Sequence, residues 1–262
     1  MNQQAAYFGL HFKRYFSLLF EPASITSRCV VLICNPIGQE NIRTNKAVIH
    51  LGRELAGQGI PAMTFDYFGM GDSSGRSEDM TSHSCLESIT ESAAYLKSQT
   101  GIDDVILLGI RMGGLFALGS DAVIRPKAVV LWHPVINGAA YVEESRREHR
   151  KWLLGSFVPK DGLFKKKTEM LGFLYSESFN EQISRMRVDL HAMNRTCLWL
   201  GNTDPKSMDS PAGENKHVTY LASAYRKFWT KSGLDDAIVP IHDIRCIVNW
   251  IKPLGVLTPT NR

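Results

Sequence analysis

A glycine-bounded turn is the feature of this sequence whose residue types most directly suggest chemistry. The apolar run 105–108 leads into Gly109, Arg111 and Gly113, and a helix of small and apolar residues follows. Two glycines flanking a central residue at a strand-to-helix turn form the pattern that exposes a nucleophilic side chain. Serine, cysteine or aspartate is expected at the centre, and this chain has Arg111 there.

Arginine cannot replace the nucleophile, because its guanidinium stays protonated and has no free electron pair for attack on a carbonyl. At a helix N-terminus, Arg111 would strengthen a site that already attracts anions, and it could hold a carboxylate or a phosphate through two hydrogen bonds. The alternative is an internal ion pair with Asp204 or Asp66 that fills the site. In either case we expect a strained backbone at Arg111.

Three further residues are candidates for acid–base chemistry. Asp204 is either a catalytic acid or a turn-forming residue before Pro205. His242 is either a catalytic base or a surface histidine at the start of the last helix, and its closeness in sequence to Trp250 favours the surface histidine. His133 follows a predicted strand. It is either a catalytic base or a structural residue at the sheet edge whose hydrogen bonds are satisfied within the fold.

Composition excludes several function classes. The formal charge of +4 is too small to predict nucleic-acid binding, and no spacing of histidines, cysteines or glycines indicates a metal or a cofactor. The scattered cysteines predict reduced thiols, with Cys29, Cys34 and Cys197 buried in strands. With neither a signal peptide nor a membrane span predicted, we expect a cytoplasmic protein. No sequence feature indicates an oligomeric state.

The order of the elements predicts an α/β fold with a mostly parallel sheet flanked by helices. We expect two strands over residues 4–21, buried strands that include the runs 28–35, 105–108 and 196–201, and helices that begin near Thr44 and at the closing 241–251 segment. Candidate side chains follow several of these strands and should gather at one edge of the sheet. They are Asn35, Asp66, Arg111, His133 and Asp204.

Residues 138–192 interrupt the alternation of strands and helices. We predict that residues 1–137 and 193–262 form the core, and that 138–192 is a helical lid inserted into it. The part from Glu143 to Glu169 is rich in lysine and arginine and also contains large apolar residues. We expect a solvated lid whose apolar face covers the pocket; contact with anionic lipid or an acidic partner is the less favoured alternative.

The chain resembles the α/β-hydrolase superfamily, in particular its serine aminopeptidase-like members. Besides the turn at Arg111, the motif FDYFGMGDSSG matches the family's D-x-x-G-x-G-D-S loop, and GNTD matches the turn that carries its triad acid. The resemblance implies that Asp204 is this acid. It also implies an oxyanion hole formed by the N–H of Met112 and a backbone N–H near Ile37. Ser73 and Ser74 are expected to stabilise their loop.

A closer resemblance is to bacterial exosortase A system-associated hydrolases, carried by NPIGQENIRTNK, LWHPVINGAAYV and EMLGF. One subgroup of that branch has arginine in its own turn, in a G-L-R-L-G form. The resemblance therefore implies that Arg111 is a subgroup feature, and it implies no particular substrate.

Two functional hypotheses follow. In the first, the protein is a hydrolase or acyl-transfer relative for an ester, thioester or amide, acting on a small-molecule or acyl substrate. Water would attack directly, activated by His242 or His133 with Asp204, while Arg111 holds an anionic group or the oxyanion. In the second, the protein is a pseudoenzyme. It would bind an anionic ligand or a partner protein in a bacterial polysaccharide or protein-sorting pathway.

Overall fold

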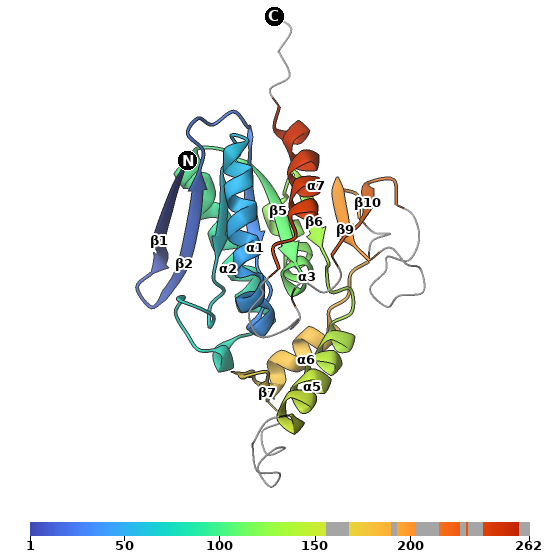
Figure 1. Cartoon of the computed structure of the whole chain (residues 1–262). Coiled ribbons are helices and arrows are strands. Elements are labelled where there is room, and N and C mark those ends of the chain that lie inside the picture. Colours follow the sequence, from blue (N-terminus) through green and yellow to red (C-terminus); the bar gives the residue numbers. More distant parts are fainter. Residues whose placement is uncertain (156–167, 190–192, 203–214, 226–228, 230–237, 257–262) are drawn as a thin grey trace, which may run out of the picture.

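An eight-stranded sheet forms the centre of the computed structural model (Figure 1). The structure describes residues 1–155, 168–189, 193–202, 215–225, 229 and 238–256. The strands of the sheet are β1 (Asn2–Leu10), β2 (Lys13–Glu21), β3 (Cys29–Cys34), β4 (Ala62–Phe65), β5 (Asp104–Ile110), β6 (Ala128–Trp132), β9 (Cys197–Gly201) and β10 (Val218–Ala222). Their order across the sheet is β1-β2-β4-β3-β5-β6-β9-β10.

Most neighbouring strands in this sheet are parallel. Only the pairs β1–β2 and β2–β4 are antiparallel, and both involve the N-terminal hairpin. The other five pairs run in parallel. The predicted mostly parallel sheet and the predicted strands within residues 4–21 are therefore confirmed.

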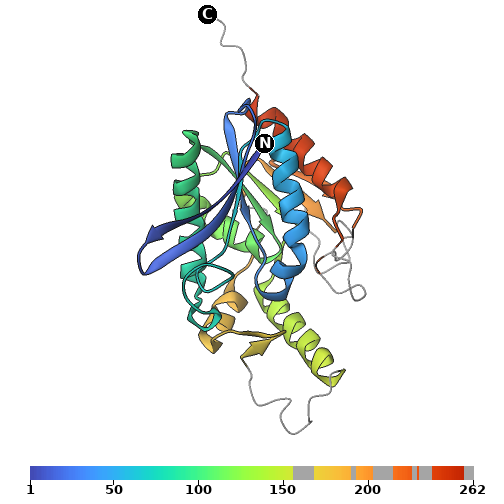
Figure 2. The same ribbon diagram turned by 60° about the vertical axis from the view of Figure 1, so that its left-hand side comes forward.

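Helices cover both faces of the sheet. They are α1 (Gly38–Gly57), α2 (Ser82–Thr100), α3 (Met112–Gly119), α4 (Asp121–Ile124) and α7 (Ile241–Ile251). All six residues of β3 are buried, with Val30 and Leu32 packed in the core cluster of α2 and α3, and Val31 and Ile33 in that of α1 and α7. Figure 2 shows α2 on one side of the sheet and α1 and α7 on the other. An apolar run without alternation is thus explained by burial on both faces.

Helix α1 begins at Gly38, and the predicted start near Thr44 is wrong. The polar residues of its first turns carry no apolar periodicity, so the pattern could not reveal them. Gly38 has a φ of 61°, and the acidic Glu40 lies in the first turn, where it interacts favourably with the helix dipole. This extension of α1 has a direct consequence for the candidate site.

The inserted segment forms a separate layer beyond one end of the sheet (Figure 1). Its described parts are α5 (Gly138–Leu154), the hairpin β7 (Glu169–Met170) and β8 (Phe173–Leu174), and α6 (Glu177–Arg185). Residues 156–167, which include four of the eight lysines and arginines between Glu143 and Glu169, lie outside the described residues. The domain limits and the role of this layer as a lid stay predictions.

The structure also tests the expectations for the cysteines and for the two serines of the glycine-rich loop. Cys29, Cys34 and Cys197 are buried free thiols, as predicted. Ser73 Oγ donates to the backbone oxygen of Asp66, and Ser74 Oγ accepts from the N–H of Arg14, so both serines stabilise their loop. In the described part of the chain, we find no helix long and apolar enough to cross a membrane.

Candidate active site

Arg111 lies in the sharp turn between β5 and α3. Its backbone has φ 51° and ψ −120°, which confirms the strain predicted for a non-glycine residue there. The flanking glycines are required by close backbone approaches. A Cβ on Gly113 would lie 2.0 Å from the carbonyl oxygen of Cys34, and a Cβ on Gly109 would lie 2.3 Å from Cα of Gly114. The turn therefore has the backbone of a nucleophile-bearing elbow, with an arginine at its centre.

The guanidinium of Arg111 points into the protein and pairs with Glu40. Only 4% of Arg111 is exposed, and its Nε and Nη2 atoms each lie 3.1 Å from Oε1 of Glu40. Glu144 of α5 is more distant, with its Oε2 at 3.9 Å from Nη2. The structure thus shows an internal ion pair, with a carboxylate that the sequence did not indicate.

The sequence suggested Asp66 or Asp204 as the ion-pair partner of Arg111, and the structure describes only the first of these. The Asp66 carboxylate accepts a hydrogen bond from the N–H of Asp72 at 3.0 Å and belongs to the glycine-rich loop. Asp204 lies outside the described residues, so its role as an acid stays a prediction. Glu40 was missed because α1 was predicted to begin after it. A helix that starts directly after β3 would have placed Glu40 at the same sheet edge as Arg111.

Two aromatic rings complete the surroundings of Arg111. Its Cζ atom lies 4.3 Å from the ring centroid of Trp229 and 6.0 Å from that of Tyr141. A guanidinium over an aromatic face at such a distance gains a favourable cation–π interaction, which is stronger where water is excluded. The ion pair with Glu40 and the two aromatic rings together fix the position of the Arg111 side chain.

Burial also shifts the ionisation of the neighbouring groups. Desolvation raises the pKa of Glu40, and the positive charge of Arg111 opposes this shift. Burial and then the charge of Arg111 lower the pKa of His133 to about 4. His133 has a φ of 46°, and its ring centroid lies 4.6 Å from that of Trp229. The imidazole beside Arg111 is therefore neutral at pH 7.

This shift at His133 predicts a pH-dependent stability. An unfolded histidine binds its proton near pH 6.5, while the folded one binds it only near pH 4. Folded stability is then lost as pH falls through this window, by about 3 kcal/mol for this residue alone. Denaturant unfolding at pH 7 and at pH 4 should show this loss in the wild type and not in His133→Asn, which tolerates positive φ. The raised pKa of Glu40 acts in the opposite direction in both proteins, so equal pH slopes would refute the assignment.

His242 lies apart from this group of side chains. It is the second residue of α7, and its side chain is 64% exposed, as expected for a surface histidine at a helix start. Its Nδ1 lies 3.7 Å from Sγ of Cys246, one turn along the same helix. Among the described residues, the histidine brought to Arg111 is His133. The assignment of His242 as a base stays a prediction.

Met112 and Ile37, the predicted sources of the oxyanion hole, are both buried at helix starts. Met112 is the first residue of α3, and Ile37 directly precedes α1. Backbone N–H groups at these positions have no acceptor within their own helix. They remain candidates for binding a ligand oxygen.

A cavity of about 490 Å³ lies next to the ion pair. Its wall contains the aromatic residues Tyr141, Trp152, Tyr175 and Trp229 and the charged residues Glu40, Arg43, Glu144, Glu148 and Lys151. Acidic and basic groups are mixed in this wall, and its residue Glu40 is the partner of Arg111. In the part of the chain that the structure describes, no cluster of histidine, cysteine, aspartate and glutamate could hold a metal ion.

Comparison with known families and structures gives a consistent result. The family described as serine aminopeptidase, S33, matches residues 30–208, which is more than half of the chain. No curated protein sequence matches this chain.

Solved structures share the architecture at low sequence identity. An α/β serine hydrolase without lid from Xanthomonas campestris is 13% identical, with a TM-score of 0.58 over 98% of this chain and 97% of that one. Est1E from Butyrivibrio proteoclasticus, solved with ferulic acid, is 18% identical, with a TM-score of 0.60 over 95% and 97%. An esterase from Pyrococcus furiosus is 13% identical, with a TM-score of 0.64 over 96% and 91%. These likenesses confirm the predicted fold and do not extend to substrates.

Proposed function

The chain belongs to the serine aminopeptidase S33 family of α/β-hydrolases, and from this premise we propose that it binds a ligand without hydrolysing it. The observation that carries the proposal is the position of Arg111. It occupies the elbow where a nucleophile is needed, and it is buried and paired with Glu40. A guanidinium cannot form an acyl-enzyme.

The ligand site of this proposal is the cavity beside the ion pair. Trp229 and Tyr141 offer aromatic surface, and Glu40, which lines the cavity, is paired with Arg111. An anionic ligand group would compete with Glu40 for the guanidinium. A neutral carbonyl or hydroxyl can instead contact the pair without displacing it. We infer a small molecule or acyl chain with a neutral polar end, rather than the anionic ligand that the sequence suggested.

A second candidate function is hydrolysis by a directly activated water molecule. The buried His133 favours it, because its neutral imidazole lies beside Arg111 and is able to accept a proton. A base whose pKa is near 4 is a weak one at neutral pH, however, and general-base efficiency falls with basicity. We therefore place this mechanism second.

The resemblance to exosortase A system-associated hydrolases suggests a context for the ligand. That resemblance includes a subgroup with arginine in the same turn. It supports a role for this protein in a bacterial polysaccharide or protein-sorting pathway, with Arg111 as an inherited feature of a binding protein.

Hydrolysis of p-nitrophenyl butyrate and a butyryl thioester, measured at high protein concentration, tests whether the protein is catalytic. We expect the wild type and Arg111→Ala to match the uncatalysed rate, because neither has a nucleophile at the elbow. Saturable hydrolysis by the wild type that Arg111→Ala or His133→Asn abolishes would contradict the proposal. It would establish the water-based mechanism instead.

Binding is tested separately by calorimetric titration with hexanamide and hexanoate, which share the same alkyl chain and end in a neutral amide and a carboxylate, respectively. The proposal expects hexanamide to bind more tightly than hexanoate, and Trp229→Ala to weaken both. Preference for hexanoate would favour the anionic ligand, and binding unaffected by Trp229→Ala would exclude this cavity as the site.

A further inference from the structure

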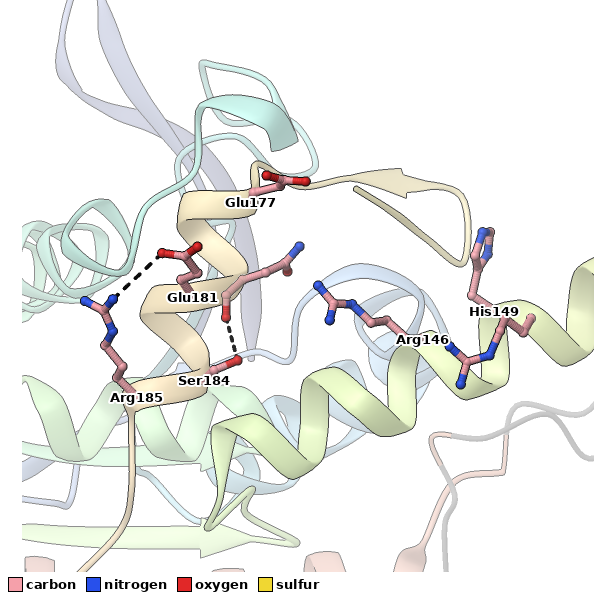
Figure 3. A pocket seen from close by; sticks show the side chains of 8 residues that line it. Arg146, His149, Glu177, Glu181, Ser184 and Arg185 are labelled. Atoms are coloured by element: carbon pink, nitrogen blue, oxygen red, sulfur yellow. Dashed lines mark hydrogen bonds and ion pairs between the residues drawn. The ribbon is translucent and has the colours of Figure 1, made fainter. Parts of the chain in front are cut away.

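A second cavity, of about 720 Å³, lies between α5 and α6 (Figure 3). It is lined by Arg146, His149, Arg150, Glu177, Asn180, Glu181, Ser184 and Arg185. The cavity beside Arg111 is lined by other residues of α5, among them Tyr141 and Glu148. Helix α5 therefore separates the two cavities and offers a different face to each.

Arg146 is a cation available for binding in the second cavity. Its side chain is partly buried and extends from α5 toward α6 (Figure 3). Among the described residues, it has no carboxylate or carbonyl partner within hydrogen-bond distance. The other cations are engaged, since Arg150 pairs with Glu143 at 3.3 Å and Arg185 with Glu181 at 3.8 Å. A partly desolvated guanidinium that no carboxylate of the described residues contacts favours binding of an oxyanion.

Asn180 is an independent sign of an occupant. Only 2% of the residue is exposed, and within the described part of the chain neither its side-chain nitrogen nor its side-chain oxygen has a hydrogen-bond partner. Its backbone oxygen is satisfied, because it accepts from Ser184 Oγ at 2.7 Å. Buried amide side chains are almost always paired, since an unpaired one is costly. A ligand that pairs with the Asn180 amide would remove this cost.

His149 contributes a donor with a fixed orientation. Its Nδ1 accepts a hydrogen bond from the N–H of Leu171, at 3.1 Å, in the turn between β7 and β8. In the neutral ring, the proton is then on Nε2, which becomes a donor. Arg146 and His149 lie three residues apart on one helix and can contact the same group.

We propose that the cavity between α5 and α6 binds a small molecule that carries one phosphate or carboxylate group. Arg146 and the Nε2–H of His149 bind the oxyanion, and the amide of Asn180 pairs with it or with a neighbouring polar group of the ligand. The acidic Glu177 and Glu181 on the α6 side disfavour a second anionic group and accept hydrogen bonds from hydroxyls. This site is independent of the ligand proposed for the cavity beside Arg111.

Isothermal titration of the protein with inorganic phosphate, and separately with acetate, tests this proposal. We expect at least one anion to bind, and Arg146→Gln and Asn180→Leu each to weaken it by about tenfold or more. The matched control is Arg147→Gln, which removes the same charge from a neighbouring, exposed side chain outside the cavity. It should change affinity less than about twofold. Binding of phosphate alone or acetate alone identifies the ligand class.

Asn180→Leu supplies a second readout. Without anion, it should melt at a higher temperature than the wild type, because it removes an unpaired buried amide, and it should lose the anion-induced rise in Tm. If neither anion binds, or if Arg146→Gln binds as tightly as Arg147→Gln, the proposal is wrong. Should Asn180→Leu not fold, the comparison of the two arginine variants decides alone.

Discussion

Replacing Glu40 with leucine is expected to destabilise the folded protein by about 3 kcal/mol, because it removes the carboxylate that, among the described residues, lies nearest to the buried guanidinium of Arg111. Both nitrogens that contact Glu40 lie 3.1 Å from the same oxygen, and Arg111 is only 4% exposed. Chemical denaturation at pH 7 measures the loss. Glu40→Gln should lose less, since an amide oxygen still accepts from the guanidinium.

Glu144 is the matched control for this experiment. Among the described residues it is the second acidic side chain near Arg111, but its Oε2 lies 3.9 Å from Nη2 and its side chain is 36% exposed. Glu144→Leu should therefore change the free energy of unfolding by less than about 1 kcal/mol. If Glu40→Leu were no more destabilising than Glu144→Leu, Glu40 would not be the principal partner of Arg111.

Gly113→Ala is expected to cost about 3 kcal/mol for a different reason, which is steric. The new Cβ would lie 2.0 Å from the carbonyl oxygen of Cys34 and 2.5 Å from that of Asn35. These are backbone atoms of the last residue of β3 and of the residue that follows it, so no side chain can rotate to make space. Either β3 and the elbow separate, or α3 shifts. Thermal and urea unfolding should both report the loss.

Gly57→Ala provides the comparison for Gly113→Ala. Gly57 is the last residue of α1, and a Cβ there meets nothing within 4 Å. Alanine at this position should be neutral or should stabilise the protein by about 0.5 kcal/mol. Equal effects at the two glycines would show that the elbow is not as tightly packed against β3 as the structure indicates.

The fold could be predicted because its signals are local and repeated. The continuous apolar run of β3 reports burial on both faces, and the helical spacing of Ile244, Ile247 and Ile251 reports the buried face of α7. Such patterns persist over a whole element. The strain at Arg111 was also predictable, because the flanking glycines indicate the turn and the turn dictates the backbone.

The surroundings of Arg111 were less predictable. Glu40 lies in the polar first turn of α1, where no apolar spacing marks the helix start. The rings of Tyr141 and Trp229 come from segments in which nothing indicated a contact with Arg111. Contacts of this kind depend on how distant segments pack, which residue spacing does not encode. Similarly, Arg146 and Asn180 form one cavity only because α5 packs against α6.

The most direct test of the central claim, that Arg111 fills the place of a nucleophile as a partner of Glu40, is a double-mutant cycle with Glu40→Leu and Arg111→Met. A buried, hydrogen-bonded pair should give a coupling energy of about 2 kcal/mol, so that the double variant is more stable than the sum of the single losses predicts. A coupling energy near zero would contradict the account, because the guanidinium would then not depend on Glu40.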